Sequence, residues 1–435
     1  MKAKFLFLIL VIGFFGCNPA SQQNIEIPAS DLKQAIVAFA ELNQELQSEQ
    51  GHLWNHNLDG PLLLINRDTR TVIANESDDE GFLKKQGDFY VGLFPENLNI
   101  ANSTTNWLDK HWTMVALPLS DTKEERLSLL LHESFHRIQP LIGFDSMYQT
   151  ACVHLDTEQG RLFLKMELEA LKAALSDTSF VQHLKNALLF RTYRYQLFPE
   201  AREAENLQEL KEGLAEYTGS ILAYKSDSAL QSHYISNING LYNNKTFVRS
   251  FAYRTLPVYG HFMQKTNPRW NLDISKNSNL TDYMNDLFEI DTRIVDSQYI
   301  RQLGDTYRMD SIMEFEKIRE QNRVQLVKTY KSRFLDRETV SIGLENMHIG
   351  FSPGNIMPLD TLGTVYPNLR ITDNWGILEV DSGGALVSPQ WDNVIISAPM
   401  EITDSLISGM GWTLKLDQGW NLEEAGGKFQ VRKKN

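Results

Sequence analysis

The stretch LLLHESFHRIQP, residues 129–140, sets His132 and His136 four residues apart, with Glu133 directly after the first histidine. In an α-helix, residues four apart lie on the same face, so the two imidazoles can reach one metal ion. Glu133 lies beside them and can accept a proton from a water molecule on that ion. The alternative is an ordinary amphipathic helix with two solvated histidines. That alternative leaves unexplained why the pair follows the apolar run LSLLL, on a face expected to be partly buried.

Catalytic zinc takes three protein ligands and leaves one position for water, so two histidines need a third group. A histidine six residues past His136 would give the metzincin pattern, but that position is Ile142. The stretch ENLQELKEGLAEYTG, residues 205–219, instead offers four glutamates whose spacing places them on one helical face: Glu205, Glu209, Glu212 and Glu216. A solvated acidic stripe is the alternative, although Leu214 and Leu222 indicate that this helix packs against other elements.

Together, HExxH and the E-G-x-A helix resemble the gluzincin zinc peptidases, over about residues 112–265. The resemblance implies Glu212 as the third zinc ligand. It implies Glu216 as a carboxylate that bonds to a ligating histidine and orients it. Glu209 is the fallback ligand and otherwise supports the ligands alongside Glu216. The fold implied is zincin-like, and the cofactor is one Zn²⁺ per chain.

The same resemblance extends to FAYRTLPVYGHF, residues 251–262, which is similar to an aminopeptidase segment carrying a tyrosine for the oxyanion. It implies Tyr259 as the first choice and Tyr253 as the second, and either can equally be a core residue. The G-x-M-E-N segment of aminopeptidases has no counterpart in residues 61–120, so aminopeptidase activity is not inferred. HWTMVALPL, residues 111–119, is expected to be an edge strand that pairs with an extended substrate.

The elements that must position these residues follow from hydrophobic periodicity. Residues 31–48 predict an amphipathic helix, and 61–119 predict short strands separated by Asn, Asp and Gly. The chain from 121 to about 335 predicts helices, the first of them closed by Pro140. Further helices are expected at 157–176, 179–195, 203–224, 247–266 and 309–334. Residues 336–435 predict an all-β C-terminal domain, so the expected fold class is α+β, with residues 31–335 as the zincin-like metallopeptidase domain.

Composition limits the partners. The chain has 435 residues, of which 42% are hydrophobic and 22% charged, as is ordinary for a folded protein. Its formal net charge of −13 argues against nucleic acid as a partner, because a phosphate-binding surface needs clustered lysines and arginines.

The first residues, MKAKFLFLILVIGFFGC, resemble a bacterial lipoprotein signal peptide. Two lysines precede an apolar run too short to span a bilayer, and the run ends at Cys17, the expected lipidation site. A plain secretory signal cleaved nearby is the alternative. Residues 18–30 are then a tether. If Cys17 is acylated, Cys152 has no partner for an intramolecular disulfide.

These observations predict a zinc-dependent peptidase, exported and lipid-anchored in a bacterial cell envelope, that acts on peptide or protein substrates. Glu133 is expected to be the general base. Two alternatives stay open: a catalytically silent binding protein on a zincin scaffold, and a zinc hydrolase of non-peptide amides or esters.

Overall fold

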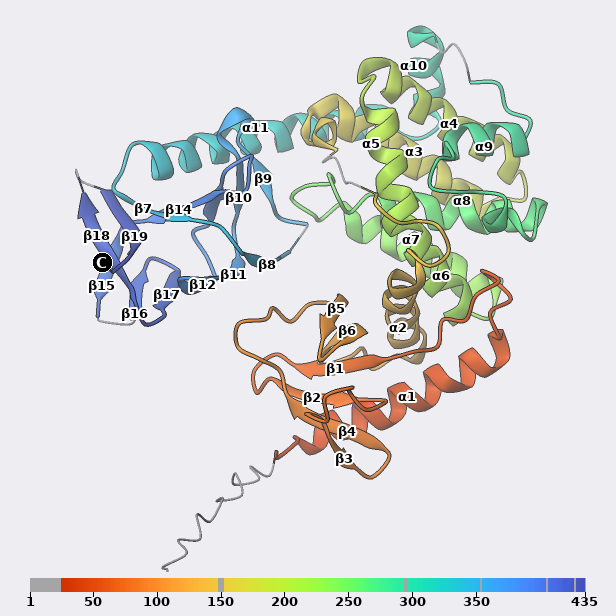
Figure 1. The fold of residues 1–435 in the computed structure, drawn as a ribbon. Helices are drawn as coiled ribbons and strands as arrows, with labels where there is room; N and C mark the ends of the chain where they lie inside the picture. The colour runs from red at the N-terminus through yellow and green to blue at the C-terminus, as the bar shows by residue number, and fades with distance from the viewer. Residues whose placement is uncertain are drawn as a thin grey trace, which may run out of the picture.

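The computed structural model describes residues 25–147, 152–292, 296–352, 354–403, 406–425 and 428–434. An N-terminal sheet is followed by a helical middle and by two C-terminal sheets (Figure 1). The predicted α+β class, with its helical middle and β-rich end, is confirmed at this level. The predicted signal peptide and Cys17 lie outside the described residues.

The N-terminal sheet has six strands in the order β3-β4-β2-β1-β6-β5. Their bounds are β1 Leu62–Asn66, β2 Thr71–Ala74, β3 Lys84–Gln86, β4 Phe89–Leu93, β5 Ser103–Trp107 and β6 Lys110–Leu117. β6 pairs parallel with β1 and antiparallel with β5. The expectation that residues 111–119 form an edge strand was therefore wrong. Residues 112–117 are buried without a break, which is typical of a central strand, and the edge strand is the more polar β5.

Two helices flank this sheet. α1 (Ala29–Glu49) buries a stripe that includes Ala35, Ala38 and Leu42, as its helical spacing requires. α2 (Lys123–Ile138) follows β6 directly and packs on it, on α1 and above all on α6. Arg126 of α2 pairs with Glu41 of α1 at 2.9 Å, which fixes the two helices to each other.

The helical middle encloses the main core. Its helices are α3 Glu158–Ser176, α4 Phe180–Leu197, α5 Ala201–Gln208, α6 Leu214–Ala223, α7 Asp227–Leu241, α8 Ala252–Thr266, α9 Leu280–Leu287, α10 Ser297–Asp305 and α11 Met309–Leu335. Short 3₁₀ turns lie at Val153–Asp156 and Trp270–Leu272.

The helix expected at 203–224 is present, but its middle, Glu209–Gly213, is a π-helix between α5 and α6. Two glycines let this region approach its neighbours. A Cβ on Gly213 would lie 2.8 Å from Cβ of Leu256 in α8, and one on Gly219 would lie 2.4 Å from the carbonyl oxygen of Ser128 in α2. The glycines therefore set how closely this helix packs between α2 and α8.

The C-terminal region consists of two packed sheets, in the orders β18-β19-β7-β14-β13-β10-β9 and β15-β16-β17-β12-β11-β8. Their bounds are β7 Thr339–Gly343, β8 His348–Phe351, β9 Met357–Pro358, β10 Thr364–Tyr366, β11 Leu369–Asp373, β12 Gly376–Val380, β13 Ala385–Val387, β14 Asn393–Ser397, β15 Pro399–Ile402, β16 Leu406–Gly409, β17 Trp412–Leu416, β18 Trp420–Ala425 and β19 Lys428–Lys433. A 3₁₀ turn lies at Asp360–Leu362. Alternate residues of these strands, such as Ile371 in β11 and Leu378 in β12, are buried in the core.

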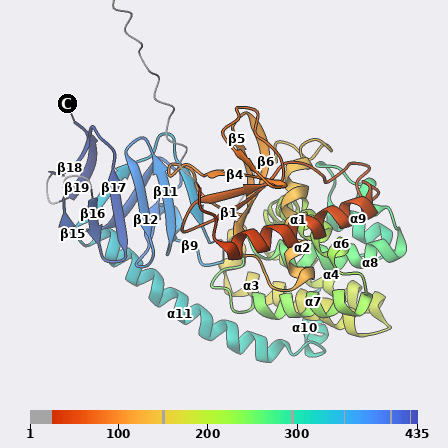
Figure 2. The same cartoon turned by 90° about the horizontal axis from the view of Figure 1, so that it is seen from below.

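α11 joins the helical middle to the C-terminal sheets. It runs along one side of the molecule (Figures 1 and 2) and packs on α3 and on β14. Its Glu316 is buried against Arg161 and Lys165 of α3 in ion pairs. In the part of the chain that the structure describes, no helix combines the length and apolarity needed to cross a bilayer.

Candidate metal centre

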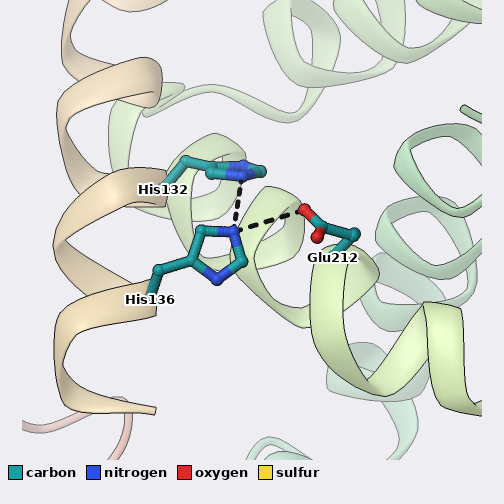
Figure 3. A group of neighbouring side chains, drawn as sticks. All are labelled: His132, His136 and Glu212. Carbon is teal, nitrogen blue, oxygen red and sulfur yellow. Dashed lines mark hydrogen bonds and ion pairs between the residues drawn. The ribbon is translucent and has the colours of Figure 1, made fainter. Parts of the chain in front are cut away.

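α2 carries the two histidines on the face that it turns toward α6 and the π-helix. Its other faces are anchored by buried residues that include Leu130, Leu131 and Phe135. The Nε2 atoms of His132 and His136 lie 3.1 Å apart and face each other (Figure 3). The helical spacing therefore brings the two imidazoles together, as the motif predicts.

Glu212 approaches from the π-helix on the opposite side. Its Oε2 lies 3.3 Å from Nε2 of His136 (Figure 3). The ligand atoms of His132, His136 and Glu212 all lie within 4.8 Å of one another. Two imidazole nitrogens and one carboxylate oxygen thus converge on one point from two helices.

The Nδ1 atoms of both histidines have hydrogen-bond acceptors of their own. Nδ1 of His132 lies 3.0 Å from Oε2 of Glu216, and Nδ1 of His136 lies 3.0 Å from Oε1 of Gln139. A proton held on each Nδ1 leaves both Nε2 lone pairs pointing at each other. Two imidazole nitrogens and a carboxylate that face one another can share a cation, and this N₂O donor set fits zinc.

Gln139 also links the two ligand-bearing segments. Its Nε2 donates to the carbonyl oxygens of Leu210 and Lys211, both at 3.0 Å. These carbonyls belong to the π-helix that carries Glu212. One amide side chain therefore orients His136 and holds the opposing helix in place.

Glu133 lies beside the histidines and is 4% exposed. Its Oε2 is buried and has no hydrogen-bond partner among the described residues. Burial raises the pKa of Glu133 above its usual value, against the opposing effect of the two histidines. A buried carboxylate with an unsatisfied oxygen next to a metal-binding group is suited to accept a proton.

The carboxylates give the site a strongly negative potential. Burial opposes the charged form of His132, but the hydrogen bond to Glu216 and the nearby carboxylates outweigh it and raise the pKa of His132 to about 9. Burial also opposes the charged forms of Glu212 and Glu216, yet their histidine partners hold the pKa of each below its usual value. The site therefore favours a bound positive charge.

Of the two tyrosines predicted for the oxyanion, one lies beside the histidines and the other lies in the core. Tyr253 stacks on His132 and donates to Oε2 of Glu212 at 2.6 Å. Tyr259 is fully buried and donates to Glu167 at 3.0 Å, with Arg191 over its ring. The preference for Tyr259 is therefore corrected: of the two, Tyr253 is the tyrosine at the metal centre.

The predicted acidic face divides into two pairs. Glu212 and Glu216 reach the histidines, whereas Glu205 and Glu209 turn into the core. Glu205 pairs with Arg194 and Glu209 with Arg191, each at 2.6 Å. This corrects the expected role of Glu209, which has no contact with the histidines and supports the core instead. The intervening π-helix has a wider turn than an α-helix and rotates the second pair away from the first.

Two cavities open onto the metal centre. One, of about 570 Å³, is lined by His132, Glu133, His136 and Glu212, with residues 144–147 at its rim. The other, of about 1180 Å³, shares His132, Glu133 and Tyr253 with the first and extends toward the C-terminal sheets. The ligand groups are thus accessible to a substrate.

Sequence reasoning missed two residues at this centre. Gln139 was readable from its spacing, three residues after His136 on the same helix. Arg254 follows Tyr253 and lies 3.8 Å from Glu216, and it donates to the carbonyl oxygen of Tyr253. Only the three-dimensional arrangement indicates its place.

Comparisons of this chain with protein families, with curated proteins and with solved structures find no match.

Proposed function

We propose that this protein is a zinc-dependent peptidase of gluzincin type, with His132, His136 and Glu212 as the metal ligands. One observation carries the proposal: three ligand atoms converge while both histidine Nδ1 atoms are bonded to other residues. A zinc ion held there supplies Lewis acidity, which lowers the pKa of water and polarises a carbonyl group.

The chain's own groups would do the rest of the chemistry. Glu133 accepts a proton from the attacking water at its unpartnered Oε2 and later gives it to the leaving nitrogen. Tyr253 donates a hydrogen bond from its hydroxyl to the oxygen on which negative charge develops. Burial, together with the charge of Glu212, raises the pKa of Tyr253 well above its usual value, so the hydroxyl stays protonated and can donate this hydrogen bond.

The test combines zinc content with hydrolysis of a mixed-sequence library of quenched peptides. Wild type should bind one zinc ion per chain and cut peptides. Glu133→Gln should keep the zinc and lose activity, because an amide cannot accept the proton from water. His132→Ala should lose the zinc.

The two alternatives predict other results. A catalytically silent binding protein would show no turnover in wild type with zinc bound. A hydrolase of non-peptide substrates would leave the library intact and cleave amide or ester substrates in a manner that depends on Glu133.

We also infer that the mature chain is lipid-anchored through Cys17 in a bacterial cell envelope. The basis is the order of charged residues, apolar run and Gly-Cys in the first seventeen residues. Cys17→Ala should move the protein from the membrane fraction to the soluble fraction. Wild type found in the soluble fraction without detergent would exclude the anchor.

A further inference from the structure

The two cavities extend in opposite directions along α2 from the metal centre. Glu125 and Ser128, toward the start of α2, line the larger cavity. Gln139 and Pro140, at its end, line the smaller one. Because His132, Glu133 and Tyr253 line both, the two cavities adjoin at the metal centre, and we treat them together as one cleft.

A second segment of the chain, residues 99–104, lies along both cavities. Residues 99–102 line the larger cavity, and residues 102–104, which lead into β5, line the smaller one. Among the strands that the structure describes, β5 pairs only with β6, so its other edge keeps backbone groups available for pairing. The span from Glu125 to Pro140 is roughly 22 Å by helical rise. That length matches about six to seven residues of extended chain.

The far wall of the larger cavity comes from the C-terminal sheets. It consists of three segments: residues 350–352 at the end of β8, residues 368–370 at the start of β11, and residues 379–381 at the end of β12. These sheets are joined to the cleft at Arg370, which donates to Oδ1 of Asn99 and to the carbonyl oxygen of Glu96, both at 2.7 Å. The wall and the segment leading into β5 are therefore held at a fixed separation.

The lining of the larger cavity suits a peptide backbone. It is rich in side-chain amides, from Asn99, Asn102, Asn237, Asn244 and Asn368. An amide offers both a donor and an acceptor, as does each peptide unit. Charges of both signs, such as Glu379 and Arg370, lie along the same wall. Recognition of this kind binds an extended chain with little dependence on its side chains.

We propose that the C-terminal sheets form a substrate-binding wall, and that the substrate is an internal stretch of an extended polypeptide cut in mid-chain. This rests on the proposed peptidase function. It assigns the C-terminal domain a part in the active site and makes the protein an endopeptidase.

The first experiment compares substrates. The probes are reduced and carboxymethylated α-lactalbumin, and mixed-sequence quenched peptides of four and ten residues with acetylated and amidated ends. Wild type should cut the protein at internal bonds, as mapped by mass spectrometry. It should also cleave the longer peptides with a kcat/KM at least about tenfold higher than the shorter ones. Stepwise release of terminal residues, or equal rates at both lengths, would overturn the proposal.

The second experiment measures binding without turnover. In the Glu133→Gln background, fluorescein-labelled carboxymethylated α-lactalbumin is titrated by fluorescence anisotropy. Asn368→Ala and Asp381→Ala, on the wall, should each raise Kd roughly three- to tenfold, the effect of one lost hydrogen bond. Asp417→Ala is the matched control, because Asp417 is exposed in the same domain but does not line the cleft.

The outcomes separate the two proposals. A wild type without zinc or turnover overturns the peptidase function. A wild type that binds zinc and cuts peptides, but whose affinity for the probe is unchanged by both wall variants, overturns the role of the C-terminal sheets. Zinc content and thermal midpoint should match wild type in all three variants, so a loss of affinity reports the wall and not the fold.

Discussion

The ring of Tyr253 is stacked on the ring of His132, with centroids 5.6 Å apart and planes within 4° of parallel. This contact holds the Tyr253 hydroxyl beside the proposed metal ligands. Of the two tyrosines predicted in the 251–262 segment, it favours Tyr253 as the oxyanion donor. Tyr259, six residues later, is enclosed among Glu167 and Arg191.

Tyr253→Phe should lower kcat by roughly 100- to 1,000-fold, because it removes a donor to the developing oxyanion. Zinc content and thermal midpoint should stay near those of wild type. Tyr259→Phe is the matched control: it should keep kcat and lose about 1–3 kcal/mol of stability, since Glu167 loses a buried donor. Steady-state kinetics and thermal unfolding of both variants check this. The reverse pattern would restore Tyr259 as the oxyanion donor.

Glu212→Gln and Glu209→Gln should differ in their effect on zinc binding, although both residues lie in the same π-helix. Glu212→Gln should lose zinc, and with it the stabilisation that zinc gives the folded state. Glu209→Gln should keep zinc but lose about 3–5 kcal/mol of stability, because Arg191 is left buried without one of its carboxylates. Zinc stoichiometry and unfolding in denaturant measure the two effects. Loss of zinc in Glu209→Gln alone would reassign the third ligand.

Gln139→Leu should weaken zinc binding by about 10- to 100-fold, because His136 loses the acceptor that fixes its tautomer. Competition with a chelator gives the zinc Kd. Gln47→Leu, at an exposed position of α1, is the control and should bind zinc like wild type. A Gln139→Leu variant with normal zinc affinity and a lowered thermal midpoint would show that Gln139 only joins the two helices.

Stability should fall in acid because of Glu205. Burial opposes its charge, but Arg194 and His154 outweigh burial and hold the pKa of Glu205 below its usual value. A carboxylate with a lowered folded-state pKa stabilises the fold above its unfolded pKa of about 4.3, and that contribution is lost as pH falls from there toward the folded-state pKa. Denaturant unfolding of wild type between about pH 5 and pH 2 should show this loss.

Glu205→Gln should be less stable at neutral pH and should show a shallower decline in acid. Glu203→Gln is the control, since Glu203 is an exposed residue of the same helix. An unchanged decline in Glu205→Gln would place the acid sensitivity elsewhere in the buried ion-pair network.

The convergence of the proposed metal ligands could be predicted from the sequence because the placement of each depends on a local rule. His132 and His136 are four residues apart on one helix, and helical geometry alone brings them together. Glu212 and Glu216 are also four apart, so one helical face presents both to α2. The α+β division was readable for the same reason, since the hydrophobic period changes from two to about 3.6 near Leu119 and back near Leu335.

The predictions that the structure contradicts concern residues whose positions depend on tertiary packing. Tyr253 and Tyr259 are six residues apart, which places them about 120° apart around α8, and the motif alone does not tell which of them faces α2. β5 has the polar sequence STTNW, so the sequence favours the more hydrophobic β6 as the strand beside the substrate. The burial of Glu205 and Glu209 depends on Arg194 and Arg191, which lie on another helix.

The π-helix has a consequence for the directions in which the two halves of this helix face. A π turn holds one residue more than the α-helical turn that it replaces. If the same residues formed one regular α-helix without the π turn, Glu212 and Glu216 would be turned by about 100° relative to Glu205 and Glu209. Such a regular helix would keep its backbone hydrogen bonds but could satisfy only one of its two sets of partners, the core arginines or the histidines. The extra residue of the π turn therefore lets a single helix direct the carboxylates of its first half to arginines in the core and those of its second half to the histidines in the cleft.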